Sequence, residues 1–149
     1  MNGHQLKAII DKDKYMSRMF VGIIKAKNFV AIPRTKHPPK AYIVNTENHW
    51  VLVVYYHHKT VYFDSYGEKP TVPMFRKLGC IQQSLIKLQP LDSSLCGLYV
   101  IFVLHYLARG VAFNRVLHMF YKKRKCNDKL VANFALSKYG FDAEFEIKV

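Results

Sequence analysis

The sequence predicts a mixed α+β fold from three patterns of apolar residues. Between residues 41 and 66, three runs rich in Val, Ile, Tyr, Phe and Trp are separated by short polar segments, which is typical of neighbouring strands. From Leu95 to Ala108, apolar residues occupy every face of an expected helix, so this helix should be buried. Residues 141–149 alternate apolar and acidic side chains, as a half-buried strand does. Strands packed around one buried helix make an α+β domain.

The remaining elements follow from local signals along the chain. In order, we expect a short helix at 5–10, a proline-rich surface loop at 33–40, strands at 41–45, 49–56 and 60–66, a short helix and a further strand within 74–89, the buried helix at 95–108, a helix at 114–123 and a last strand at 141–149. The prolines of the loop forbid regular structure, and Gly110 is a natural stop after the buried helix.

Size and composition indicate one basic domain over residues 1–149. The chain has 23 Lys and Arg against 10 Asp and Glu, a formal charge of +13, which favours polyanionic partners such as nucleic acid. Its cysteines, Cys80, Cys96 and Cys126, are widely spaced and form no C-x-x-C pair, which argues against a disulfide framework and a zinc site and favours a reducing compartment. We expect no secretion signal and no membrane-spanning segment, because no apolar run approaches 18 residues.

Cys96 lies where the buried helix is expected to begin. Unpaired backbone N–H groups and the positive end of the helix dipole favour a thiolate there. The preceding Asp92, Ser93 and Ser94 are good N-cap residues, and Gly97 would leave room for a substrate backbone. The alternative, that Cys96 is an inert core residue, stays open on this observation alone.

Three further residues complete a possible catalytic set. A thiol nucleophile needs a histidine base, and that histidine needs a carboxylate or amide to orient it. His49 begins one expected strand and Asp64 lies late in the next, so a hairpin brings both to the same end, with a bend or bulge needed to join them. Gln89, seven residues before Cys96, could join the Cys96 N–H in binding an oxyanion.

The order and context of these residues resemble a known family. His49-Trp50, the stretch YFDSYG at 62–67, Gln89 and Cys96-Gly97 look like the adenovirus endoprotease family, adenain, and more distantly the SUMO-specific proteases. The resemblance covers about residues 5–110 and leaves 111–149 divergent. It implies an adenain-like cysteine protease fold, in which a central mixed or antiparallel sheet packs against a buried helix that carries the nucleophile at its N-terminus.

The resemblance also implies roles and partners. Cys96 would be the nucleophile, His49 the general base and then acid, Asp64 the group orienting His49, and Gln89 with the Cys96 N–H the oxyanion hole. The implied activity is cysteine endopeptidase cleavage next to glycine in capsid or core precursor proteins during virion maturation, in the host nucleus or the virion. No metal or organic cofactor is implied, whereas DNA or a short viral peptide, the latter through Cys80, could activate the enzyme. We expect a monomer.

Basic residues supply the candidate DNA-binding surface. Lys122, Lys123, Arg124 and Lys125 form the densest cluster, and Arg34, Lys36 and Lys40 form a second. Phosphate contacts from such residues would be independent of DNA sequence. Two other functions remain open: an isopeptidase that removes a ubiquitin-like modifier, and a non-enzymatic basic binding protein in which Cys96 is a core residue.

Overall fold

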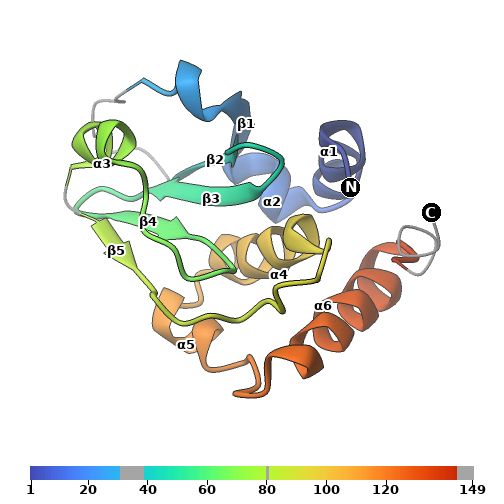
Figure 1. Cartoon of the computed structure of the whole chain (residues 1–149). Coiled ribbons are helices and arrows are strands. Elements are labelled where there is room, and N and C mark those ends of the chain that lie inside the picture. The colour runs from blue at the N-terminus through green and yellow to red at the C-terminus, as the bar shows by residue number, and fades with distance from the viewer. Residues whose placement is uncertain (31–38, 80, 144–149) are drawn as a thin grey trace.

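The computed structural model describes residues 1–30, 39–79 and 81–143. Its elements are α1 (Gly3–Asp11), α2 (Lys14–Met19), β1 (Phe20–Lys25), a short 3₁₀ turn η1 (Ala26–Asn28), β2 (Lys40–Asn45), β3 (Trp50–Tyr55), β4 (Thr60–Phe63), α3 (Val72–Leu78), β5 (Ile81–Gln83), α4 (Cys96–Ala108), α5 (Phe113–Leu117) and α6 (Arg124–Tyr139), as Figure 1 shows. Most of the expected proline-rich loop, Cys80 and all but the first three residues of the expected last strand lie outside the described residues.

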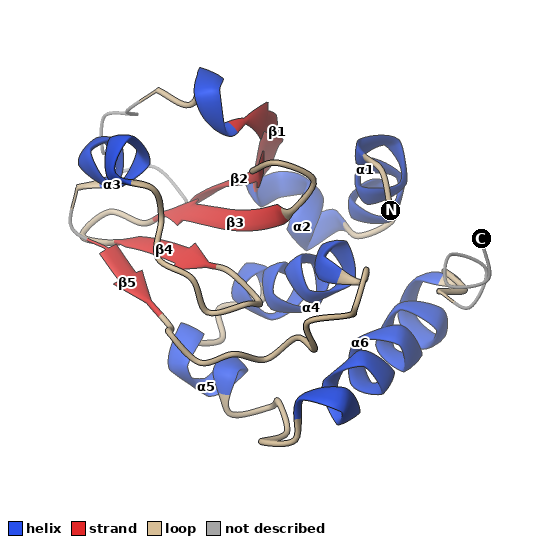
Figure 2. Ribbon diagram, in the orientation of Figure 1, coloured by secondary structure: helices blue, strands red, loops and turns tan. Residues whose placement is uncertain are grey.

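The strands form a mixed sheet in the order β1-β2-β3-β4-β5 within the described part of the chain (Figure 2). The central strands β2, β3 and β4 pair antiparallel, whereas β1 and β5 join the two edges in parallel. This arrangement confirms the α+β class. The structure also contains elements that the sequence did not indicate, among them α2 and the edge strand β1.

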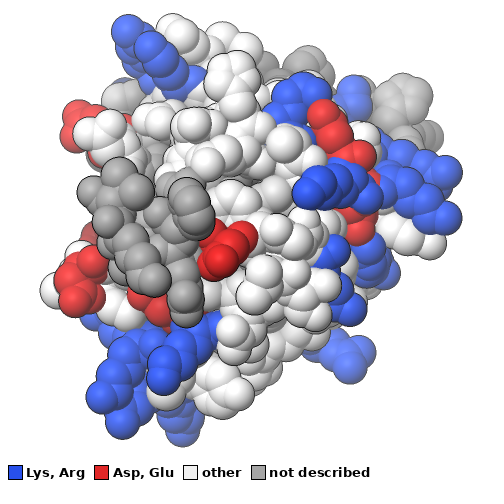
Figure 3. Space-filling model, turned by 90° about the vertical axis from the view of Figure 1, so that its right-hand side faces the viewer, with Lys and Arg blue, Asp and Glu red and all other residues white. Residues whose placement is uncertain are grey.

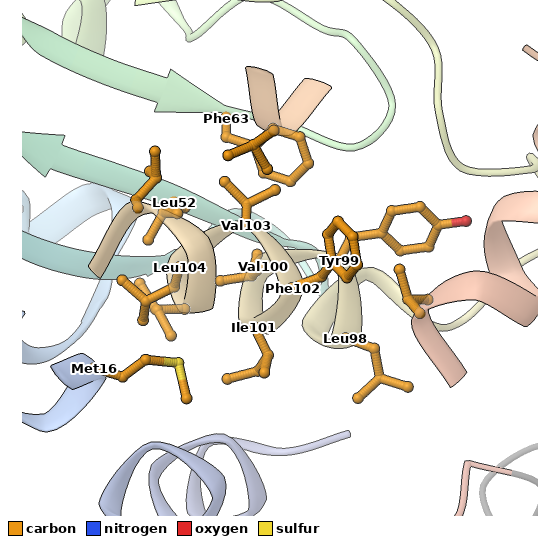
Figure 4. Close-up of a cluster of buried hydrophobic side chains, with 14 of the residues drawn as sticks. Met16, Leu52, Phe63, Leu98, Tyr99, Val100, Ile101, Phe102, Val103 and Leu104 are labelled. Atoms are coloured by element: carbon orange, nitrogen blue, oxygen red, sulfur yellow. The ribbon is translucent and has the colours of Figure 1, made fainter. Parts of the chain in front are cut away.

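Helix α4 is the centre of the core. All of its residues except Tyr106 and Ala108 are buried, which confirms the predicted buried helix. Leu52, Val54 and Phe63 project from the sheet onto α4, and Met16 of α2 covers another side (Figure 4). The alternate strand residues Val51, Val53 and Tyr55 form a second cluster on the opposite face of the sheet, together with Met74 and Leu78 of α3.

The region after α4 differs from the expected helix at 114–123. Helix α5 ends at Leu117, and a separate helix, α6, begins at Arg124. The break is fixed by the buried side chain of Asn127, which accepts a hydrogen bond from the Tyr121 N–H (2.7 Å) and donates one to the Tyr121 carbonyl (2.9 Å). Both backbone groups of Tyr121 are thereby unavailable for a continuous helix. Among the described residues, no helix is long and apolar enough to cross a membrane.

We predict that core packing around α4 dominates the stability of the fold. Leu104→Ala should lower the free energy of unfolding by about 3 kcal/mol, because it removes a fully buried side chain and leaves a cavity. Leu136→Ala on α6 is the matched control: this leucine is 51% exposed, and its loss should cost less than about 0.5 kcal/mol. Urea denaturation of both variants measures the difference, and equal losses would contradict the prediction.

Candidate active site

His49, Asp64 and Cys96 meet at one end of the sheet. His49 immediately precedes β3, Asp64 immediately follows β4, and Cys96 is the first residue of α4. The start of β3, the end of β4 and the start of α4 lie together at this end of the molecule (Figure 1). The structure therefore brings together three of the four residues in the predicted catalytic set by direct interaction.

The expected bend between His49 and Asp64 comes from turns rather than from a bulge. Strands β3 and β4 pair without interruption from Tyr55 and Thr60 to Leu52 and Phe63. A tight turn, with Glu47 and Asn48 at φ 48° and 67°, delivers His49 to the start of β3. The ring Nε2 then lies 2.7 Å from Asp64 Oδ1.

Strand β4 ends at Phe63, three residues earlier than predicted, because Asp64 starts a turn. Its Oδ1 accepts a hydrogen bond from the Tyr66 N–H (2.8 Å), and its carbonyl accepts one from Gly67 (2.9 Å). Gly67 has φ 71°, and a Cβ there would lie 2.7 Å from the Leu85 carbonyl oxygen, so only glycine fits. The turn aims the carboxylate at His49 and away from the ladder.

His49 is placed to be a cation at neutral pH. Burial lowers the pKa of the ring, but hydrogen bonds and charges from Asp64 and Cys96 outweigh burial and raise the pKa to about 9. Since Asp64 engages Nε2, the nitrogen left for the thiol of Cys96 is Nδ1. The ring of Tyr66 lies over the imidazole, with 4.7 Å between the ring centroids.

Cys96 is placed to be an anion. Burial raises the pKa of the Cys96 thiol. This effect is outweighed by the hydrogen bond and charge of His49 and by the backbone N–H groups of Trp50 and Gly97, so the pKa lies below the ordinary value. Helix α4 begins at Leu95 as N-cap, without the side-chain cap that the sequence suggested. Without such a cap, the N–H of Gly97 in the first turn is left to the sulfur. Both pKa shifts are in the direction that favours a thiolate beside an imidazolium.

The space expected beside Gly97 is filled by the protein itself. A Cβ on Gly97 would lie 2.7 Å from the sulfur of Met1 and 3.2 Å from a methyl group of Leu6. The indole of Trp50 donates a hydrogen bond to the Met1 carbonyl (3.1 Å) and holds this residue in place. The glycine thus serves internal packing, and the prediction that it admits a substrate backbone is wrong for this side of the residue.

Gln89 is a fully buried residue of the loop before α4. Its Oε1 accepts a hydrogen bond from the Ser65 hydroxyl (2.5 Å), and its Nε2 donates to the carbonyl and the hydroxyl of Ser93 (both 3.1 Å). Because the Ser93 carbonyl only accepts, these contacts fix which end of the amide carries the hydrogens. Its part in an oxyanion hole stays a prediction.

The four residues of the predicted DNA-binding cluster do not share one environment. Lys122, Lys123 and Lys125 are exposed, whereas the guanidinium of Arg124 turns inward and donates hydrogen bonds to the Gln89 carbonyl. Of the second cluster, Arg34 and Lys36 lie outside the described residues. Figure 3 looks onto the end of the molecule that carries the site and shows an uncharged band bordered by both basic and acidic groups.

A cavity of about 620 Å³ adjoins the His49–Asp64 pair. It is formed at the ends of β1, β2 and β4 and by α3; its charged lining residues, besides His49 and Asp64, are Lys25, Lys27, Lys69, Glu47 and Glu68. Among the described residues, no group of acidic, histidine or cysteine side chains could hold a metal ion. Sequence reasoning missed Tyr66 and Ser65, although both lie in the stretch YFDSYG that pointed to Asp64.

Comparisons with known proteins find little. No protein-family model and no curated protein matches the chain. Two crystal structures of the ASFV pS273R protease, one of them a selenomethionine form, each share 18% identity with it. The matches cover 56% and 52% of this chain with TM-scores of 0.47 and 0.41, and they span 39% and 36% of the protease chains. A likeness this low assigns neither a family nor an activity.

We predict that His49 makes the thiol of Cys96 more acidic. Alkylation of Cys96 by iodoacetamide, followed by mass spectrometry over a pH series, should keep its rate to lower pH in the unmutated protein than in His49→Ala, because the substitution removes the hydrogen bond and charge that lower the thiol pKa. Identical pH profiles of Cys96 alkylation in the two proteins would contradict the His49–Cys96 interaction.

Proposed function

We propose that this protein is a cysteine endopeptidase of the adenain type. The observation that carries the proposal is the contact series from Asp64 through His49 to Cys96 at the start of a buried helix. A nucleophile, a base within hydrogen-bond reach and a carboxylate that orients the base are the parts that thiol proteases need. Core packing alone does not require a buried thiolate with a buried imidazolium.

The reaction follows from the charges at the site. The Cys96 thiolate attacks the scissile carbonyl carbon and forms a C–S bond, while negative charge moves to the carbonyl oxygen. The His49 imidazolium donates its proton to the leaving amine as the C–N bond breaks. His49, now neutral, takes a proton from water, and the resulting hydroxide forms a C–O bond with the thioester carbon. The C–S bond then breaks, the acid product leaves, and the Cys96 thiolate and the protonated His49 are restored. Asp64 stays ionised and holds the ring throughout.

The limited exposure of Cys96 favours substrates with small residues at the scissile bond. Cys96 is only 8% exposed, so a substrate must reach it as a narrow extended chain, and glycine offers the least hindrance. The leaving amine must lie beside His49, which borders the 620 Å³ cavity, so this cavity suits the substrate residues after the scissile bond. We propose glycine-containing capsid or core precursors as substrates.

The proposed setting is virion maturation on DNA. The charge of +13 and the three exposed lysines, Lys122, Lys123 and Lys125, suit sequence-independent contacts with phosphates. We propose that DNA, and a short viral peptide as a second activator, raise the activity of a monomer in the host nucleus or the virion, and that no metal or organic cofactor takes part. The proposed use of Cys80 by such a peptide concerns a residue outside the described part of the chain.

The activity test uses peptides with glycine at the cleavage site. Cys96→Ala and His49→Ala should each lower kcat by at least about 10³-fold, whereas Cys126→Ala should have little effect. The rate should decline at low pH as Cys96 takes up its proton, and decline again through about pH 9 as His49 loses its proton. Full activity in Cys96→Ala would exclude the mechanism.

A second substrate separates the two protease hypotheses. A lysine side chain joined to a ubiquitin-like modifier with a Gly-Gly tail tests the isopeptidase, assayed beside the capsid-type peptides with and without DNA. Preference for the modifier together with indifference to DNA would overturn the adenain-type assignment and favour the isopeptidase.

The proposed DNA surface gives a salt-dependent prediction. Replacing Lys122, Lys123 and Lys125 together by Ala should weaken binding to duplexes of any sequence and reduce the slope of log K against log salt by up to about 3, since each phosphate contact adds nearly one unit. The control removes the same charge from exposed Lys14, Lys59 and Lys138. Fluorescence anisotropy over a salt series measures both, and equal slopes in the two triple variants would show that the charge is not localised.

A further inference from the structure

The first turns of α6 reach into the loop that precedes the nucleophile. This loop runs from β5 to α4 and passes beside the start of α6 (Figure 2). Three residues of the helix make the contacts: Arg124, Asn127 and Asp128. They belong to the region that has no counterpart in the family resemblance, and the proposed chemistry uses none of them.

Arg124 and Asn127 satisfy two consecutive carbonyls of the loop. The Asn127 amide donates to the Leu88 carbonyl (3.0 Å), and the Arg124 guanidinium donates through Nε (2.9 Å) and Nη2 to the Gln89 carbonyl. On the other side, the N–H groups of Leu88 and Gln89 both donate to the Ser65 carbonyl (2.9 Å each). The backbone at Gln89 is therefore held from α6 on one side and from the Asp64–Gly67 turn on the other.

Asp128 connects the loop with α4. Its Oδ1 accepts hydrogen bonds from the Ser93 hydroxyl and from the Tyr99 hydroxyl on α4, each 2.8 Å long. The Ser93 hydroxyl in turn accepts from the Gln89 amide (3.1 Å) and from the Leu95 N–H (3.2 Å), immediately before Cys96. A continuous chain of hydrogen bonds therefore leads from α6 to the Gln89 amide and to the first turn of α4.

We propose that Arg124, Asn127 and Asp128 are positioning residues that fix Gln89 relative to the backbone N–H of Cys96. We propose these two groups for the oxyanion, for which a Gln89 amide hydrogen must turn from Ser93 to the substrate oxygen. Misplacing one of the two groups by about 1 Å can cost about 100-fold in rate. The inference rests on the proposed protease function. It assigns Arg124 to the active site and leaves only the three lysines of its cluster for DNA.

The test compares loss of contact with loss of charge. Asp128→Ala and Arg124→Ala should lower kcat for peptide cleavage about 10- to 100-fold with KM changed less than about twofold. Asp128→Asn should restore most of the rate, because its side-chain oxygen can still accept both hydroxyl hydrogens. Lys129→Ala, which removes an exposed charge from the same helix, and Asn133→Ala, which removes an exposed amide, are the controls and should match the unmutated protein.

Two further measurements separate positioning from loss of structure. Iodoacetamide alkylation of Cys96, including its pH profile, should be unchanged in Asp128→Ala, because the His49 contact is independent of α6 and alkylation needs no oxyanion hole. Hydrogen exchange in residues 88–96 should become at least about tenfold faster in Asp128→Ala and Arg124→Ala but not in the controls.

Each outcome has a defined meaning. Unchanged kcat in an active protein, or a loss of kcat accompanied by an equal loss of Cys96 reactivity, would overturn the positioning role. If the unmutated protein cleaves no peptide, the protease proposal fails by itself. In that case, hydrogen exchange alone decides whether α6 holds the loop, and unchanged exchange overturns that too.

Discussion

The burial of α4 on all sides is the constraint on which the rest of the structure depends. A helix of 13 residues, with eleven of them buried, cannot lie on the surface of a sheet; it needs cover from every direction. The sheet covers one face, α1 and α2 a second, and α5 and α6 the remainder. The N-terminal end of this helix lies beside His49, so the position of Cys96, the proposed nucleophile, is set by core packing as much as by local chemistry.

The sheet brings His49 and Asp64 to the N-terminal end of α4. Adjacent antiparallel strands place the start of β3 beside the end of β4, so residues flanking those strands meet without any long loop. The imidazole then lies between the Asp64 carboxylate and the Cys96 sulfur, and these two partners raise its pKa to about 9 in spite of burial. The same contact lowers the pKa of the Cys96 thiol, so each member of the pair favours the charged form of the other.

Much of the fold and of the candidate site could be predicted from the pattern of residues, and the elements that were missed have physical reasons. Continuous apolar runs identified β2, β3 and α4, and the order His49, Asp64, Cys96 identified the residues that meet. Strand β1 was missed because apolar residues lie on both of its faces, exposed Val21 and Ile23 on one and partly buried Phe20 and Ile24 on the other, so no alternation of polar and apolar residues appears. Helix α6 was missed because its apolar residues, such as Val131, Phe134 and Tyr139, are diluted by lysines on the outer face. Met1 fills the space beside Gly97 although the two residues are far apart in the sequence, and a contact between such distant residues leaves no local pattern.

The basic run at 122–125 shows why charge alone cannot assign a residue to a surface. The sequence does not distinguish its four basic residues, yet at the start of α6 one side chain turns inward and three point to solvent. A guanidinium can donate two hydrogen bonds to one carbonyl oxygen while its stem lies along the protein, whereas an ammonium group is more strongly hydrated and stays in solvent. Arg124 therefore binds the Gln89 carbonyl, and its lysine neighbours remain exposed. If DNA contacts those lysines, as we propose, it lies at the start of the helix whose Arg124 and Asn127 bind the Leu88 and Gln89 carbonyls, which gives a physical route from a polyanion to the proposed catalytic groups.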